Sequence, residues 1–135
     1  MATRSQVREA VVGLLYAYES GNEAALHKAS DFLTQKKIKN AQQHFALELL
    51  EGTLKHLNAL DGALKPLLKD WDLARMGCME RAILRLGAYE ILHTQTNPIV
   101  VINEAVELSK TYGEDHAPKL INAILDALSR QNPRT

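Results

Sequence analysis

NPIVVINEAVELSKTYG, residues 97–113, is the stretch of sequence that decides the fold class. Its apolar run Ile99–Ile102 would be typical of a buried strand if it stood alone. The apolar positions after it recur at helical spacing, however, and the length of the whole segment favours a helix. Asn97-Pro98 is typical of a helix start, because the fixed φ of proline suits the first helical position, and Gly113 is typical of a helix end. The segment is therefore predicted to be a helix over 98–112.

Apolar stripes at helical spacing run through most of the remaining sequence as well. Thr3 and Gln6 fit a capping box, in which side chains and backbone close the first turn of a helix reciprocally. Asn22 is suited to cap a shorter second helix after a stop at Gly21. Helices are predicted over 3–20, 40–60, 79–93, 98–112 and 118–129, with a buried face formed by Val11, Leu15, Phe45, Leu49, Ile83, Leu86, Ile102, Val106, Ile121 and Leu125.

The connections between these segments are short, which favours a bundle. Asp61-Gly62 is expected to break or restart the helix that begins at Asn40, and Pro66 is expected to end or kink the segment that runs into it. Leu64 and Leu67 indicate a short apolar turn between the two. The sequence thus predicts an all-α protein, a compact bundle of roughly six to seven helices.

Composition places the chain among single globular domains. It has 135 residues, of which 46% are hydrophobic and 24% charged, a balance that excludes global disorder. The 16 basic and 16 acidic side chains cancel, so any binding of nucleic acid has to come from a local basic surface. Basic residues gather at the N-terminus, near the C-terminus, and at Lys36, Lys37 and Lys39. The ordinary interpretation of such clusters is a solvated surface.

The single cysteine and the lack of a long apolar run narrow the class further. Cys78 alone cannot form a disulfide scaffold or a cysteine zinc site, and it fits a reducing compartment. No apolar run approaches the length of a membrane span, and the N-terminus carries no signal-peptide core. We therefore expect a soluble, cytoplasmic protein without a membrane partner.

Signatures of catalysis and of bound cofactors are missing from the sequence. Neither GxxxxGK[ST] nor GxGxxG occurs, so a phosphate-cradling loop is not predicted. The 5 histidines do not pair at metal-ligand spacing, and Glu104 and Glu107 share a helix face without a histidine partner for acid–base work. Cys78, at a helix start, is interpreted as a packing residue. We predict a protein that is not an enzyme and that uses no cofactor or metal, so its function has to lie in binding.

The helix predicted over 79–93 carries the features of a binding surface. Glu80, Arg81 and Arg85 cannot all lie on its apolar face, and they are expected to form a charged flank beside it. Gly87 costs about 1 kcal/mol in helix propensity. We expect another helix to pack closely against Gly87, and the alternative is a docking surface.

Several ordered segments of the chain are similar to those of one known family. They are Arg8–Tyr16, Met79–Glu90, Val101–Lys110 and Lys119–Asp126, together with Asp61-Gly62 ahead of Pro66. In register over the whole chain, these segments resemble the NusB family of bacterial transcription antitermination factors. The resemblance implies a single NusB-like RNA-binding domain over 1–135, made of two small helical subdomains at about 1–65 and 72–131.

The resemblance also implies a function. Members of the family bind the single-stranded boxA element of nascent transcripts jointly with the ribosomal protein NusE. The complex lets RNA polymerase read through termination signals, notably in ribosomal RNA operons. By position, the resemblance assigns RNA contacts to Arg4, Arg8, Arg85, Tyr112, Lys119 and Leu120, and contacts with NusE to Tyr16 and Glu80.

Two positions depart from the family pattern, and two other function classes stay open. Arg4 and Arg8 replace a denser arginine run, and Leu120 stands where an aromatic ring would stack on a base, a contact worth about 1–3 kcal/mol. NusB-like domains also precede the catalytic domain of ribosomal RNA methyltransferases, which would require a Rossmann-like continuation beyond Thr135. A protein-interaction module without RNA contact is the other alternative, and pairing of the free protein through its partner surface also stays open.

Overall fold

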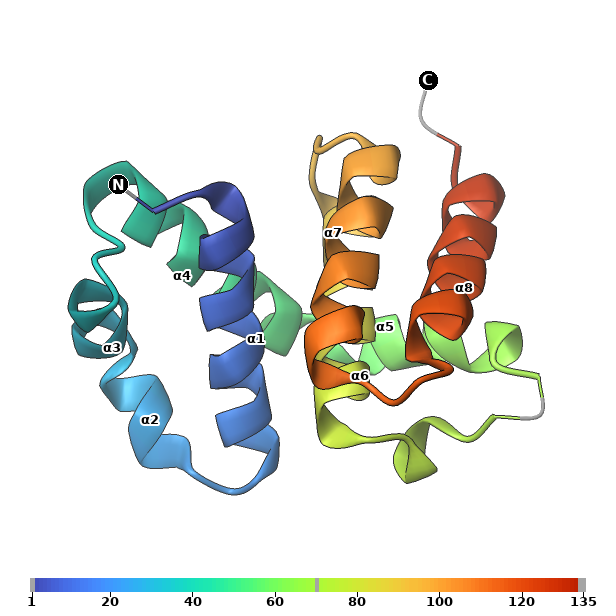
Figure 1. Ribbon diagram of the computed structural model, residues 1–135, viewed down its shortest axis with the longest axis horizontal. Helices are drawn as coiled ribbons and strands as arrows, with labels where there is room; N and C mark the ends of the chain where they lie inside the picture. The colour runs from blue at the N-terminus through green and yellow to red at the C-terminus, as the bar shows by residue number, and fades with distance from the viewer. Residues whose placement is uncertain (1, 70, 134–135) are drawn as a thin grey trace.

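The computed structural model describes residues 2–69 and 71–133. That part of the chain is helical and contains no strand, which confirms the predicted all-α class (Figure 1). Its helices are α1 (Arg4–Glu19), α2 (Glu23–His27), α3 (Ala29–Gln35), α4 (Asn40–Lys55), α5 (Leu57–Leu64), α6 (Cys78–His93), α7 (Pro98–Tyr112) and α8 (Ala117–Gln131), with 3-10 turns at Lys65–Leu67 and Leu73–Arg75. Among the described residues, none of these helices has the length and apolarity that a membrane span requires.

The helix boundaries follow the capping residues that the sequence indicates. The Thr3 hydroxyl accepts a hydrogen bond from the Gln6 backbone N–H at 3.1 Å, and the Gln6 side chain accepts one from the Thr3 N–H at 2.8 Å. This completes the predicted capping box. Asn97 caps α7, where its side chain accepts from the Ile99 N–H at 2.9 Å. The run Ile99–Ile102 lies inside α7, so the strand-like segment is helical as predicted.

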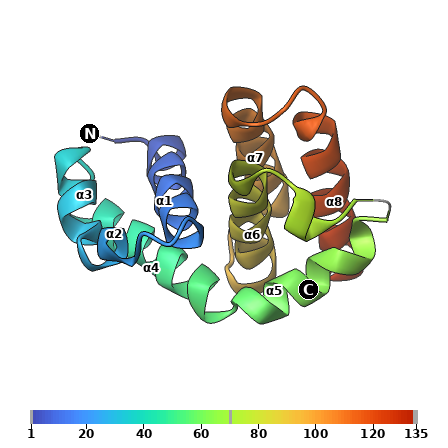
Figure 2. The ribbon, with the colours of Figure 1, turned by 90° about the horizontal axis from the view of Figure 1, so that it is seen from below.

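The helices form two halves that meet along α6. Helices α1–α4 make one half and α5–α8 the other, and both α1 and α4 pack against α6 (Figures 1 and 2). The change of partners falls at His56, where α4 ends and α5 turns to pack on α6 and α8. The two halves meet one short helix before residues 65–72, and the division into two subdomains there stays a prediction.

Two of the expected helices are each divided. The helix after Asn22 becomes α2 and α3, and the helix over 40–60 becomes α4 and α5, which gives eight α-helices in the described part of the chain. Asp61-Gly62 was expected to break the helix but lies inside α5, where the Asp61 carboxylate is held by the Arg85 side chain at 2.9 and 2.8 Å. The break lies instead at His56, which has neither glycine nor proline beside it, so the sequence does not mark it.

One apolar core runs through both halves. The predicted core residues are buried, with two exceptions, because Phe45 and Val106 are only half-buried. Phe45 lies under the guanidinium of Arg4, whose Cζ is 4.2 Å from the ring centroid. The close packing expected at Gly87 is confirmed: a Cβ there would lie 2.8 Å from Leu125 Cδ1. Gly87 is thus part of the α6–α8 contact and not of a docking surface.

Candidate functional site

Three of the predicted site residues meet in one hollow beside Met79. Tyr16 of α1, Glu80 of α6 and Tyr112 of α7 line this hollow, whose volume is about 520 Å³, and we call it the Tyr16 hollow. Met79 and Tyr112 also line a neighbouring hollow of about 520 Å³, which reaches across α1 to α3. Tyr16 is 44% exposed and Tyr112 is 41% exposed. The two tyrosines therefore present aromatic surface to solvent.

The rim of the Tyr16 hollow is acidic. Glu114 and Asp115 are exposed on it, in the connection between α7 and α8. Burial raises the pKa of Tyr112, and the neighbouring Glu9 carboxylate raises it further. The phenol is therefore protonated at neutral pH and acts as a hydrogen-bond donor. An acidic rim around aromatic rings suits a positively charged segment of another protein.

Glu80 faces inward rather than toward solvent. Its side chain accepts a hydrogen bond from the Glu114 backbone N–H at 3.2 Å, and its second oxygen lies 4.0 Å from His116 Nε2. Glu80 is 4% exposed and Arg81 is also buried. The prediction that these two residues form an exposed charged flank of the helix is therefore wrong. The role of Glu80 is to fix the connection between α7 and α8 and to form one wall of the Tyr16 hollow.

Arg8 lies in the protein interior, which corrects its assignment to an RNA-facing surface. It is 3% exposed, and its Nε and Nη2 donate to the Glu90 carboxylate of α6 at 2.9 and 2.8 Å. Burial alone would lower the pKa of Arg8, but the hydrogen bonds and the charge of Glu90 raise it. The neighbouring Val7 and Val11 are fully buried, so this side of α1 faces α6, and a phosphate in solvent cannot reach the Arg8 guanidinium.

Arg85 is held in an ion-pair network that joins α1, α5 and α6. Besides its two hydrogen bonds to Asp61, its Nη1 lies 3.8 Å from the Glu19 carboxylate. Arg81 pairs with the same Glu19 carboxylate and donates to the Met76 carbonyl at 2.8 Å. The Arg85 side chain is 15% exposed and faces two carboxylates, so its charge is neutralised within the protein. The structure therefore gives Arg85 a structural role, and its contact with RNA stays a prediction.

The remaining RNA-binding candidates lie in two separate places. Arg4 is exposed at the start of α1, in the N-terminal half. Lys119 is exposed and Leu120 is half-buried in the first turn of α8, in the other half (Figure 1). The structure thus brings Tyr16, Glu80 and Tyr112 together but keeps Arg4 on a different half from Lys119.

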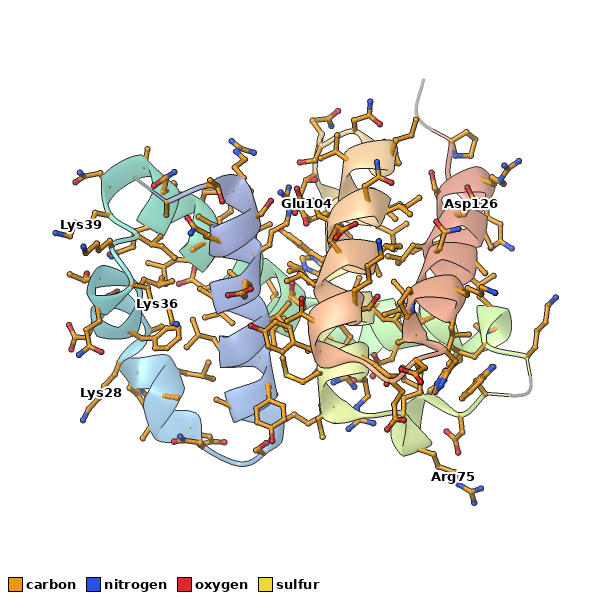
Figure 3. The ribbon with its side chains drawn as sticks, in the orientation of Figure 1. Lys28, Lys36, Lys39, Arg75, Glu104 and Asp126 are labelled. Atoms are coloured by element: carbon orange, nitrogen blue, oxygen red, sulfur yellow. The ribbon has the colours of Figure 1, made fainter. Side chains whose placement is uncertain are left out.

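A group of exposed lysines is the surface that the sequence prediction does not include among the site residues. Lys28, Lys36, Lys37 and Lys39 are exposed on the connections at either end of α3, and three of them are labelled in Figure 3. Residues 28–39 contain a single acid, Asp31. The run at 36–39 is visible in the sequence, but only the fold brings Lys28 to the same side of the molecule.

The described part of the chain offers no constellation for a metal. Over 2–69 and 71–133, no three side chains of His, Cys, Asp or Glu come together in a way that would hold a metal ion. Cys78, half-buried at the start of α6, contacts Arg81 Nη2 at 3.4 Å. The thiol is therefore packed against the ion-pair network.

Comparisons with known proteins place the chain in a family. The NusB family model matches residues 5–130. The transcription antitermination protein NusB of Helicobacter hepaticus is 56% identical over 135 residues, which cover 99% of this chain and 86% of that protein. A solved structure of T. maritima NusB matches with a TM-score of 0.84 at 28% identity, over 96% of this chain and 92% of that one. A structure of the antitermination factors NusB and NusE in complex with dsRNA matches with a TM-score of 0.82 at 26% identity, over 95% of this chain and 96% of that one. Because sequence and fold agree over nearly the whole length, this chain belongs to the NusB family.

Proposed function

We propose that this protein is a bacterial transcription antitermination factor. It binds the single-stranded boxA element of nascent transcripts together with ribosomal protein NusE and promotes read-through by RNA polymerase, notably in ribosomal RNA operons. The observation that carries the proposal is the match, over 95% of this chain, to a structure of NusB and NusE in complex with dsRNA, and the single-stranded boxA target is part of the proposal. A factor that acts on nascent bacterial transcripts works in the cytoplasm.

The Tyr16 hollow is the proposed contact with NusE. Tyr16 supplies an exposed ring, and the acidic Glu114 and Asp115 attract a basic segment of the partner. Glu80 contributes by positioning the connection that carries these two acids, because its carboxylate accepts from the Glu114 N–H. The contact therefore depends on the shape and charge of the hollow rather than on an exposed Glu80 carboxylate.

The proposed RNA contacts are reduced because Arg8 is buried and Arg85 is engaged in ion pairs within the protein. Arg4 and Lys119 are exposed cations that pair with phosphates, and the Tyr112 ring is exposed for contact with a base. Leu120, half-buried beside Lys119, offers an apolar edge. Since the chain has a net charge of zero, its own attraction for RNA is weak, and we expect tight binding to require NusE.

Fluorescence anisotropy of labelled boxA RNA tests this function. The protein is titrated alone and with equimolar NusE, against boxA and against a scrambled RNA of equal length. We expect the complex to bind boxA at least ten times more tightly than it binds the scrambled RNA, and more tightly than the protein alone does. Formation of the NusE complex without any RNA binding would overturn the proposal in favour of a protein-interaction module.

A further inference from the structure

We propose that Lys28, Lys36, Lys37 and Lys39, here called the lysine cluster, bind the phosphates of the RNA backbone, with Arg4 continuing the same surface. This inference rests on the proposed function and names the surface that holds the RNA strand. It assigns the main electrostatic contact with RNA to the N-terminal half of the molecule. The buried Arg8 of that half is not accessible to a phosphate.

In the part of the chain that the structure describes, the lysine cluster gathers four cations without acidic partners within twelve residues, whereas the other unpaired lysines, Lys55, Lys65, Lys69 and Lys119, are spread over other elements. Many cations elsewhere lie within 4.0 Å of a carboxylate, namely Arg8, Arg75, Arg81, Arg85, Lys110 and Arg130. Among the described residues, no member of the lysine cluster forms such a pair, and Asp31 is the one acid between residues 28 and 39. Phosphate binding releases counterions from the nucleic acid, and unpaired surface cations contribute to it without first breaking an ion pair.

An ordered turn presents three of these lysines. The Lys37 N–H donates to the Thr34 carbonyl and the Ile38 N–H to the Leu33 carbonyl, each at 2.9 Å. Ile38 is 1% exposed and anchors the turn in the core. The Gln43 side chain donates to the Ile38 carbonyl and to the Thr34 hydroxyl, each at 3.0 Å. The backbone that carries the charges is therefore fixed before binding, which lowers the entropy cost of association.

The lysine cluster is continuous with the N-terminus of the protein. The Gln42 side chain donates a hydrogen bond to the Ala2 carbonyl, so the first residues lie against the start of α4, directly after Lys39. Arg4 projects from this point over the Phe45 ring of α4. Cations thus follow one side of the molecule from Arg4 past Lys39 to α3, as the labelled lysines in Figure 3 indicate.

Lys36 also connects the lysine cluster to the predicted base contact. It lines the second hollow of about 520 Å³, and Tyr112 lies on the lining of the same hollow. The Lys36 ammonium lies 5.2 Å from the Phe32 ring centroid, which holds the side chain at this edge. A strand with a phosphate on Lys36 would place a base in the hollow toward Tyr112, which combines a backbone contact with a stacking contact.

The chemistry of the surface favours RNA over an acidic protein. The cluster consists of flexible side chains that each carry a point charge. The aromatic ring beside it, Phe32, is half-buried and lies under Lys36. Protein interfaces are centred on desolvated aromatic or arginine anchors and are depleted in lysine. A row of ammonium groups suits a regularly charged phosphate backbone.

The test replaces Lys28→Gln, Lys36→Gln and Lys39→Gln together. Lys37 is kept because its φ of 63° belongs to the turn, and a change there would alter the backbone. The control, Lys55→Gln with Lys65→Gln and Lys110→Gln, removes the same charge from other elements. Among the residues that the structure describes, Lys55 and Lys65 are unpaired like the cluster, and Lys110 pairs with Glu107. Both variants are measured in the NusE complex by anisotropy at several salt concentrations, after circular dichroism has checked their helical content.

For single-stranded RNA, the logarithm of the binding constant falls with the logarithm of the salt concentration with a slope of about −0.7 per neutralised phosphate. Removing three phosphate contacts should therefore make the slope of the cluster variant less steep by about 2.1. In the control, we expect the slope to change by less than the amount of about 0.7 that one phosphate contact contributes. The change in the cluster variant should be equal for boxA and scrambled RNA, because phosphate contacts do not read sequence. A wild-type slope in the cluster variant, or an equal loss in the control, overturns this inference and leaves the proposed function standing. Failure of the wild-type complex to bind RNA overturns both.

Discussion

At the scale of single residues, the decisive feature is where each arginine lies. Arg8 and Arg85 have the chemistry of phosphate ligands, yet each donates two hydrogen bonds to a carboxylate of the protein. A buried charge is tolerated only when it is paired and hydrogen-bonded, and these two pairs meet that condition. Exposed cations such as Arg4 are therefore the ones that are available to bind a phosphate of the RNA.

The Arg8–Glu90 pair should be required for stability. Arg8→Ala removes the opposite charge from a carboxylate that is 2% exposed, which typically costs about 3–5 kcal/mol. Urea denaturation should show this loss, while Arg4→Ala, at an exposed position, should change the free energy of unfolding by about 1 kcal/mol or less. The apolar double variant Arg8→Met with Glu90→Met should recover most of the loss. Equal stabilities for Arg8→Ala and wild type would contradict a buried Arg8.

At the scale of helices, close approach at glycine decides how α6 packs. A Cβ on Gly52 of α4 would lie 2.2 Å from the Tyr89 ring of α6, and Gly87 meets Leu125 of α8 in the same manner. Helix α6 therefore packs closely against both neighbours because each contact has a glycine on one side. These glycines give up helix propensity in exchange for close packing.

Two glycine variants should have opposite effects on stability. Gly52→Ala forces the Tyr89 ring to move, and overpacking of a core costs about 1–3 kcal/mol, more than the gain of about 1 kcal/mol in helix propensity. Gly13→Ala, inside α1 with nothing within 4 Å of the added Cβ, should stabilise the protein by about 0.5–1 kcal/mol. Thermal unfolding of both variants checks this, and a stabilised Gly52→Ala protein would show that α4 and α6 are farther apart than described.

The sequence predicted the helices well, but it did not predict the ion pairs between residues far apart in the chain. Residues 98–112 are a helix despite the run Ile99–Ile102, because the apolar period and the Asn97 cap are local signals. Arg8 and Glu90 are 82 positions apart, and Arg85 and Asp61 are 24 apart, so no local pattern marks either pair. The family resemblance named Tyr16, Glu80 and Tyr112 but not the acidic rim of the Tyr16 hollow, and their meeting in space depends on how α1, α6 and α7 pack.

At the scale of the whole molecule, ion pairs fasten the two halves at both ends of α1. Arg8, in the second turn, pairs with Glu90, and Glu19, at the end of the helix, pairs with Arg81. The Tyr16 hollow lies along the junction that these ion pairs stabilise, since it is lined by α1, α6 and α7. The lysine cluster begins at the second hollow, which shares Met79 and Tyr112 with the Tyr16 hollow, so the surfaces proposed for RNA and for the protein partner adjoin.

The two surfaces should respond to separate variants. Tyr16→Ala removes an exposed ring from the hollow and should weaken NusE binding by about tenfold or more, since aromatic anchors dominate such interfaces. Tyr18→Ala, a 37% exposed tyrosine of the same helix that does not line the hollow, should leave it within twofold. Calorimetric titration with NusE measures both. The prediction fails if the two variants bind NusE equally well.

The most direct test of the account is read-through itself. In a reconstituted transcription reaction with bacterial RNA polymerase, NusE and the other antitermination factors, a template carries boxA ahead of a terminator. Addition of this protein should raise the fraction of full-length transcript several-fold. The gain should be lost when boxA is scrambled, and it should fall with the Tyr16→Ala variant and with the lysine-cluster variant. An unchanged full-length fraction on adding the protein, while its complex with NusE still forms, would contradict the proposed role in antitermination.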